Sequence, residues 1–278
     1  MFGAGFVMVK TKDILELLNR IVPFDIAEDW DNSGLQAGNL DWEVKKIMIA
    51  LDVSMPLMEA AKKADCDLVI THHPLMIRPE KSFHFNKMPG SAIEVAAKHG
   101  ISIISAHTNL DKANDGLNDC FATKVGLENT KVFFIENPLS VSEDEMIGMG
   151  RIGFLKSQAT LKQVVHQIKE KLGLNHLRVI GDMDLSVNCV AVCTGSGGSL
   201  VEEFLKSEAE VYITGDIKYH EARRVEENSK ALIDVGHFGS ENMAVDLLFD
   251  KLGQAIQKVG LNIQIEKFNK EKDPFIIV

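Results

Sequence analysis

Apolar runs alternate with amphipathic segments along the N-terminal part of the chain. The runs at 45–54, 66–75 and 101–107 have the length and composition of buried strands. Between them, 53–64 and 91–100 carry apolar residues at helical spacing. Alternation of strands and helices at this spacing predicts a parallel sheet with helices on its faces.

Other segments extend this pattern. Residues 11–21 predict an amphipathic helix capped by Thr11, and a helix is also expected from about 115 to 125. Proline, asparagine and glycine indicate an ordered loop at 23–38. The stretch 142–182 predicts a connecting strand–helix–strand element. The chain is therefore expected to be α/β throughout.

An internal repeat is the most informative pattern. The segments 46–75 and 188–220 both run from an apolar strand through a serine-containing turn and a helix to a second strand that ends in Ile-Thr. The repeat continues in 101–111 and 231–241, each of which contains a His-x-x-x-carboxylate pattern. Any two parallel-sheet segments look alike in topology, but the repeated Ile-Thr and the repeated His-x-x-x-carboxylate favour two related α/β units.

The repeat leads to a prediction of domain borders. We expect a discontinuous first α/β domain formed by 1–127 plus 232–278, and a second formed by 128–231. Ligands of such sheets sit beyond the carboxyl ends of the strands. The polar residues considered below all follow predicted strands.

Composition narrows the function classes. The chain has 278 residues, is 45% hydrophobic and carries a formal charge of −10. This charge makes a nucleic-acid partner unlikely, because phosphate binding requires clustered lysine and arginine. The four cysteines form no CxxC pair, and the apolar opening segment 1–8 resembles neither a secretory signal nor a membrane span. We expect a cytoplasmic protein that has no membrane partner.

Two adjacent histidines follow the second predicted strand, directly before a proline. Neighbouring strand residues point to opposite faces, so His72 and His73 reach one site only if the strand ends there and the backbone turns. Alternatively, each binds a different metal of a pair. A single histidine at a strand end is usually a solvated residue, but two in succession favour metal ligands.

The two His-x-x-x-carboxylate patterns add further candidate ligands. On a helix, His237 and Glu241 would lie on one face, although Glu241 could instead complement the helix dipole. In the first half, Asp111 is the candidate for a carboxylate that bridges two cations. His107 is open to three roles: a ligand, a partner that orients a ligand, or a proton shuttle.

Imidazole and carboxylate ligands without thiolate suit Zn, Fe, Mn or Co. A water bound by such ions has a lowered pKa, which favours a hydrolytic reaction. The second Ile-Thr loop supplies Asp216, Lys218, His220 and Glu221; His220 or Glu221 could act as the general acid or base, or all four could form a solvated helix start.

Two further segments, 195–199 and 30–32, each allow either a binding or a structural role. The GSGGS segment at 195–199 leads into a helix and allows a phosphate site, but it has no Walker lysine and a turn is favoured. Trp30, Asp31 and Asn32 could contact a substrate or serve capping and packing.

Six motifs together resemble one known family, that of the GTP cyclohydrolase 1 type 2 homologs, also called Nif-three-like proteins. They are WDNSGLQ at 30–36, THHPL at 71–75, AHTNLD at 106–111, GxGRIG at 148–153, TGDIKYHEA at 214–222 and GHFGSE at 236–241. The resemblance covers nearly the whole chain.

The resemblance implies two related three-layer α/β domains with a dinuclear metal site in the cleft between them. Carried over by motif, the metal ligands are His72, His73, Asp111, His237 and Glu241. It also implies a homohexamer. The short 128–184 segment indicates that the domain inserted in some members of the family is absent here.

Two hypotheses about function follow. The first is a metal-dependent hydrolase with two divalent ions per subunit that acts on a nucleotide or phosphoester, in which His220 or His107 moves protons. The second is a non-catalytic metal-binding adaptor or metal-delivery protein that acts through protein partners.

Overall fold

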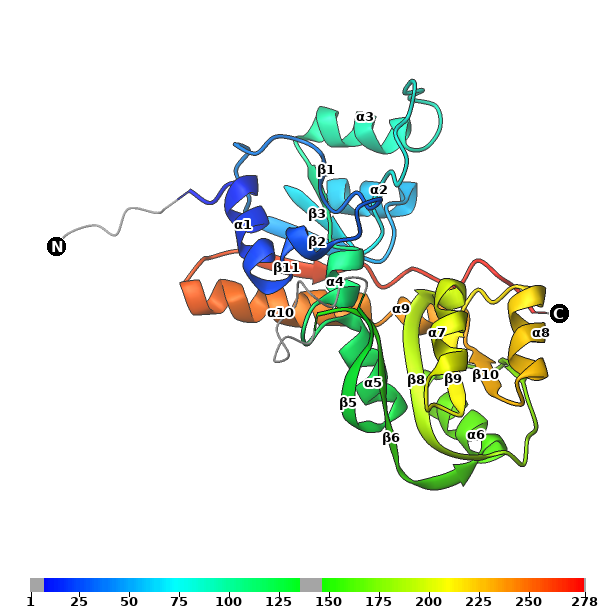
Figure 1. Cartoon of the computed structure of the whole chain (residues 1–278). Helices are drawn as coiled ribbons and strands as arrows, with labels where there is room; N and C mark the ends of the chain where they lie inside the picture. The colour runs from blue at the N-terminus through cyan, green and yellow to red at the C-terminus, as the bar shows by residue number, and fades with distance from the viewer. Residues whose placement is uncertain (1–7, 136–146, 278) are drawn as a thin grey trace. The chain divides into compact units, whose positions relative to one another are not determined.

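The computed structural model describes residues 8–135 and 147–277. The chain forms two compact units, the first made of Met1–Leu110 with Ala244–Glu271 and the second of Asp111–Met243 with Lys272–Val278 (Figure 1). Most of the apolar opening segment lies outside the described residues. The expected domains, 1–127 plus 232–278 and 128–231, stay a prediction, because two compact units do not show which segments fold independently.

The first unit is built on a five-stranded sheet of mixed direction. Its strand order is β1-β4-β3-β2-β11, in which β1 is antiparallel to β4 and all other neighbours are parallel. The strands are β1 (Gly34–Ala37), β2 (Lys46–Ala50), β3 (Leu68–Thr71), β4 (Ser102–Ser105) and β11 (Gln264–Lys267).

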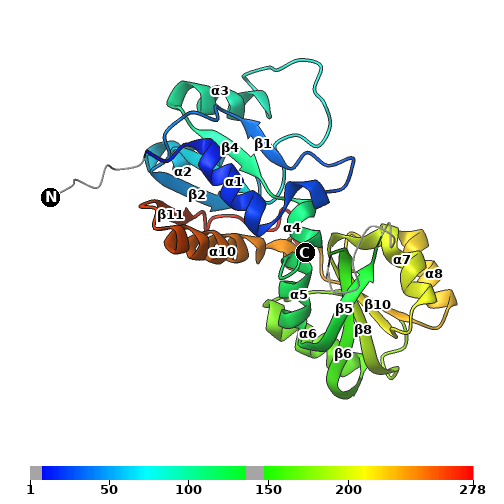
Figure 2. The ribbon, with the colours of Figure 1, turned by 60° about the vertical axis from the view of Figure 1, so that its left-hand side comes forward.

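Two helix pairs cover this sheet. Helix α1 packs against α10, and α2 packs against α3; Figure 2 shows the two pairs on opposite faces. Met48 and Ala50 of β2 pack toward the α2 and α3 face, as the two-residue period of a strand requires. The helices are α1 (Thr11–Ile21), α2 (Met55–Lys63), α3 (Gly90–His99) and α10 (Ala244–Val259).

The predicted loop at 23–38 needs a correction. It contains a 3₁₀ turn, η1 (Phe24–Ile26), and the strand β1. Strand β1 pairs Gly34 with Ser105 at the edge of the sheet. Its four residues carry no periodic apolar signal, so only pairing with β4 reveals it as a strand.

The second unit contains a six-stranded sheet in the order β5-β6-β8-β9-β10-β7. The neighbours β8, β9 and β10 are parallel, and the other pairs are antiparallel. The strands are β5 (Leu127–Phe134), β6 (Met149–Thr160), β7 (Arg178–Ile180), β8 (Ser186–Ser196), β9 (Val211–Gly215) and β10 (Ala231–Asp234).

The helices of the second unit form two groups. Helix α5 packs against α6, and α7 packs against α8. The short helix α4 spans the border between the two units in the sequence. The bounds are α4 (Thr108–Lys112), α5 (Leu117–Val125), α6 (Leu161–Leu172), η3 (Gly197–Leu200), α7 (Val201–Lys206), α8 (Tyr219–Glu227) and α9 (His237–Glu241).

Both sheets contain the same four-stranded arrangement. In the first, β2, β3 and β4 are consecutive parallel strands and β1 flanks β4 in the antiparallel direction. In the second, β8, β9 and β10 have the same relation, and β7 flanks β10. The repeat seen in the sequence therefore corresponds to a repeated sheet topology.

Free thiols belong to the interior of both units. Cys66, Cys189 and Cys193 are buried, and burial raises the pKa of the Cys66 and Cys189 thiols to about 11. A raised pKa keeps a thiol protonated and makes it a poor nucleophile. Across 8–135 and 147–277, no helix combines the length and the apolar character that crossing a membrane demands.

Candidate metal centre

Three histidines come together at the carboxyl ends of β3 and β4. Their ligand atoms lie within 4.8 Å of one another, a spacing that allows a shared metal ion. The ring centroids of His72 and His73 are 5.0 Å apart, and that of His107 is 5.2 and 5.7 Å from them. The strand ends at Thr71, so the backbone turn required for two adjacent histidines to converge is present.

Each ring of this group is oriented by an oxygen atom at Nδ1. The Nδ1 of His72 lies 2.9 Å from the carbonyl oxygen of Ala106, and that of His73 lies 2.8 Å from Asp52 Oδ1. A carbonyl oxygen only accepts, so Nδ1 of His72 carries the hydrogen. In the neutral ring Nε2 then has the lone pair that a metal requires.

The third ring is held by a buried carboxylate. The side chain of Asp31 is fully buried, and its Oδ1 lies 2.7 Å from Nδ1 of His107. The other oxygen accepts from the hydroxyls of Ser33 at 2.7 Å and Thr108 at 2.6 Å. Burial raises the pKa of Asp31, but the hydrogen bonds from His107 and Thr108 outweigh it and hold this pKa well below its usual range. Asp31 therefore orients His107.

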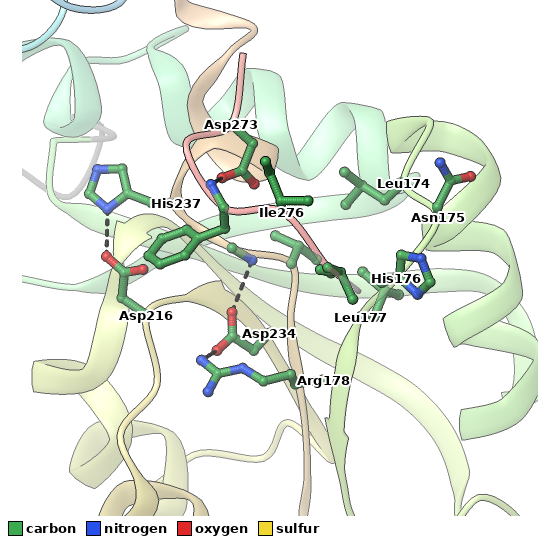
Figure 3. A pocket seen from close by; sticks show the side chains of 14 residues that line it. Leu174, Asn175, His176, Leu177, Arg178, Asp216, Asp234, His237, Asp273 and Ile276 are labelled. Atoms are coloured by element: carbon green, nitrogen blue, oxygen red, sulfur yellow. Dashed lines mark hydrogen bonds and ion pairs between the residues drawn. The ribbon is translucent and has the colours of Figure 1, made fainter.

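The second unit contains a histidine–glutamate pair in α9. Nε2 of His237 lies 2.9 Å from Oε2 of Glu241, as the spacing of four residues on a helix allows. Glu241 is only 3% exposed, so it is not a solvated residue of the helix start. The Nδ1 of His237 lies 2.7 Å from Oδ2 of Asp216, and Figure 3 shows this pair.

The partners of His73 and His237 occupy equivalent places. His73 follows β3, and its partner Asp52 follows the parallel neighbour β2. His237 follows β10, and its partner Asp216 follows the parallel neighbour β9. Both pairs are 21 residues apart in the sequence. An aspartate at the end of the preceding strand is thus a signal that the repeat could have supplied.

Asp111 belongs to the second unit and is fixed by neighbours within it. It is 5% exposed, and its Oδ1 accepts from the hydroxyl of Thr194 at 3.1 Å. Asn118 donates to the Asp111 carbonyl at 3.1 Å and accepts from the Thr194 backbone at 3.0 Å. A buried carboxylate held in this way is suited to binding a cation.

Arg151, of the GxGRIG motif, is buried and binds the segment that carries Asn118. Its side chain is fully buried and all five of its donors have acceptors. Two of them reach Asp119 of α5 at 2.5 and 2.7 Å, and one reaches the carbonyl of Ala113 at 3.1 Å. Arg151 therefore connects β6 to residues on both sides of Asn118, the Ala113 carbonyl before it and the Asp119 carboxylate after it.

Gly195 allows Glu241 to approach the end of β8. It has a φ of +64°, and a Cβ there would overlap Oε1 of Glu241. Gly195→Ala is expected to displace the carboxylate and to lower the free energy of unfolding by about 1–3 kcal/mol. Urea unfolding measures the change.

Gly253→Ala is the control for this substitution. Gly253 lies in α10 with no atom within 4 Å of the added Cβ, so a gain of up to about 1 kcal/mol is expected there. Equal stability of Gly195→Ala and the wild-type chain would contradict the proposed contact.

The acid–base candidates of the second Ile-Thr loop lie apart from these contacts, whereas His107 belongs to the histidine group. His220 is exposed on α8, with its ring 5.4 Å from that of Tyr219. Glu221 accepts from the backbone of Lys218 at 2.8 Å, which caps the N-terminus of α8. Of the four residues from this loop, Asp216 is the one that contacts a candidate ligand. The 195–199 segment forms the end of β8 and the turn η3.

Comparison with known proteins gives the family. The model of Duf34/NIF3 (NGG1p interacting factor 3) matches residues 9–274. A Clostridium acetobutylicum protein named GTP cyclohydrolase 1 type 2 homolog is 34% identical over 267 residues, which cover 96% of this chain and 98% of that protein. A Methanocaldococcus jannaschii protein with the same name is 33% identical over 236 residues, which cover 84% and 90%.

Solved structures agree with the sequence matches. A Bacillus cereus protein related to NIF3 superposes with a TM-score of 0.89 at 25% identity, covering 98% of this chain and all of the other. Reduced HcgD from Methanocaldococcus jannaschii gives a TM-score of 0.77 at 29% identity, covering 95% and 99%. These matches confirm the mixed α/β fold with two sheets and the resemblance seen in the motifs: the chain belongs to the Duf34/NIF3 family.

Proposed function

We propose that this protein holds two divalent cations and hydrolyses a nucleotide or a phosphoester with their help. The ligands would be His72, His73, Asp111, His237 and Glu241, and we add His107. The proposal requires the ligands of the two units to act together. It is supported by one observation: in all four histidines Nδ1 lies beside an oxygen acceptor, so Nε2 is the nitrogen that would bind a metal.

The residues fit such a pair of ions. Imidazole and carboxylate donors without thiolate suit Zn, Fe, Mn or Co. When bound, two such cations would polarise an electrophilic centre and lower the pKa of a coordinated water. The oxygen atoms at Nδ1, a carbonyl for His72 and an aspartate for each of the other three rings, keep each ring in one tautomer and one orientation.

The names of the relatives support a nucleotide as the substrate. Several are called GTP cyclohydrolase 1 type 2 homologs, and on this basis we propose a purine nucleotide as the first substrate to test. His220 stays the proposed proton-transfer residue, since its exposed ring is free to meet a substrate. We also propose that the protein assembles as a homohexamer.

Metal content tests the centre directly. Wild-type protein purified without a metal-affinity tag is expected to hold about two metal ions per chain, and His72→Ala and Glu241→Ala to hold fewer than about one. His166→Ala is the matched control, because its side chain is 75% exposed on α6, and it should retain the wild-type content. Elemental analysis after anaerobic reconstitution with Fe, Mn and Zn gives the numbers.

Two negative results have different meanings. If no stoichiometric metal is retained, the metal centre is wrong and a protein adaptor without metal becomes the better hypothesis. If metal is retained but GTP, other nucleotides and phosphoesters are not turned over, the hydrolase is wrong and a metal-delivery role remains.

A further inference from the structure

A pocket with apolar walls lies within the second unit and reaches His237. Its volume is about 710 Å³, which is within the usual range for sites that bind small organic molecules. Figure 3 shows His237 and Asp216 on one side, and Leu174, Leu177 and His176 on the other. The pocket therefore joins a candidate metal ligand to an apolar space that the metal centre itself does not use.

The C-terminal segment supplies one wall of this pocket. Phe275, Ile276 and Ile277 line it and remain 78%, 87% and 64% exposed. Three consecutive apolar side chains in contact with water are unfavourable, because their apolar surface is hydrated. A bound apolar group would remove part of this surface from water.

The base of the pocket is already ordered. Asp234 is 4% exposed and forms an ion pair with Arg178. Its carboxylate also accepts from the backbone of Ile217 at 3.1 Å and of Gly236 at 2.9 Å. These bonds fix the two loops that carry Asp216 and His237. A ligand would therefore meet a preformed wall and would not have to order it.

Charge decides which kind of ligand suits this space. The lining contains Asp216, Asp234 and Asp273 against a single arginine, Arg178. Without a cation, this balance repels an anionic group. Cations held at His237 would reverse the local field, and an anionic group next to His237 would then be attracted.

From these features we infer that the pocket binds a ring-bearing organic anion, with the ring against Phe275 and the apolar wall and the anionic group toward His237. The position of the ring follows from the pocket alone. The anionic end rests on the proposed function, because it needs the cations. This ligand would be the substrate, or the part of it that determines specificity.

Two dyes that differ by one sulfonate test the inference on the full chain. N-phenyl-1-naphthylamine is neutral, and 8-anilinonaphthalene-1-sulfonate adds the anionic group to the same rings. Each dye is titrated by fluorescence into metal-stripped and metal-loaded protein, and the metal content of each sample is measured. The variant is Phe275→Ala, and the matched control is Phe85→Ala, a phenylalanine 57% exposed in the first unit.

The neutral dye is expected to bind metal-stripped and metal-loaded wild-type protein with equal affinity, and Phe85→Ala should bind it as tightly as the wild type. Phe275→Ala should bind it roughly tenfold more weakly. Metal loading should tighten the sulfonate roughly tenfold or more and leave the neutral dye unchanged. Equal affinity of Phe275→Ala and wild type for the neutral dye overturns the pocket. The pocket is also overturned if the wild type binds no dye and Phe275→Ala changes the oligomer mass. In that case Phe275 belongs to a contact between copies of this chain.

The two proposals fail separately. Protein that retains no metal contradicts the proposed function, while the neutral dye still decides on the pocket. Protein that retains metal but binds the sulfonate no better than in the stripped form overturns the anionic end alone.

Discussion

Arg151→Met is expected to lower the free energy of unfolding by about 3–5 kcal/mol, because it leaves the partner of a buried ion pair without its charge. Asp119 would lose two hydrogen bonds, and three backbone carbonyls would lose their donor. Denaturant unfolding followed by circular dichroism measures the effect. Metal affinity should fall as well, since the arginine holds Ala113 and Asp119 on either side of Asn118, which contacts Asp111.

Two variants serve as controls. Arg223→Met removes a surface cation that pairs with Glu226 and Glu227 on α8, and a loss of at most about 1 kcal/mol is expected. Arg151→Lys keeps the charge but cannot form the two-pronged contact, so it should lie closer to Arg151→Met than to wild type. If Arg151→Met unfolds at the same denaturant concentration as Arg223→Met, the buried network has no role in stability.

Asp31→Asn is expected to destabilise the first unit by about 2–4 kcal/mol. The amide would place N–H groups where the carboxylate accepts from Thr108 and Ser33, so buried donors would face each other. His107 would also lose the charge that orients it. Metal affinity is expected to fall about 10–100-fold, as for other residues that orient a metal-binding histidine.

Asp29→Asn is the matched control, because Asp29 is an exposed aspartate in the same loop. It should leave both stability and metal affinity unchanged. Titration with a metal-competing chromophore gives the affinities. A change in stability without a change in metal affinity would mean that Asp31 supports the fold but does not act through His107.

Elements with a local signal could be predicted from the sequence. Helix α1 has the predicted bounds 11–21, but the predicted cap is wrong: the N-cap is Lys10, whose backbone N–H donates to Asp13, and Thr11 is the first helical residue. Helix α6 begins with a capping box in which Thr160 accepts from Gln163. Such signals depend on residues three or four apart, so no partner from elsewhere in the chain is needed to read them.

Edge strands and long-range partners could not be predicted in the same way. Strands β1, β5 and β11 lie next to one neighbour only, and few of their residues are buried. Similarly, Asp31 lies 76 residues before His107 in the sequence, and Arg151 lies 32 residues after Asp119. Nothing in the local sequence indicates which of many aspartates meets a given histidine or arginine.

The sequence by itself determined the α/β class, the repeated unit and the position of the candidate ligands at strand ends, because hydrophobic periodicity and turn residues act over short distances. Only the tertiary structure decided which side chains meet. The order of strands in each sheet brings Asp52 to His73 and Asp216 to His237, and it buries Arg151 beside Asp119. That order results from the packing of segments far apart in the chain, which is where the free energy of burial is gained.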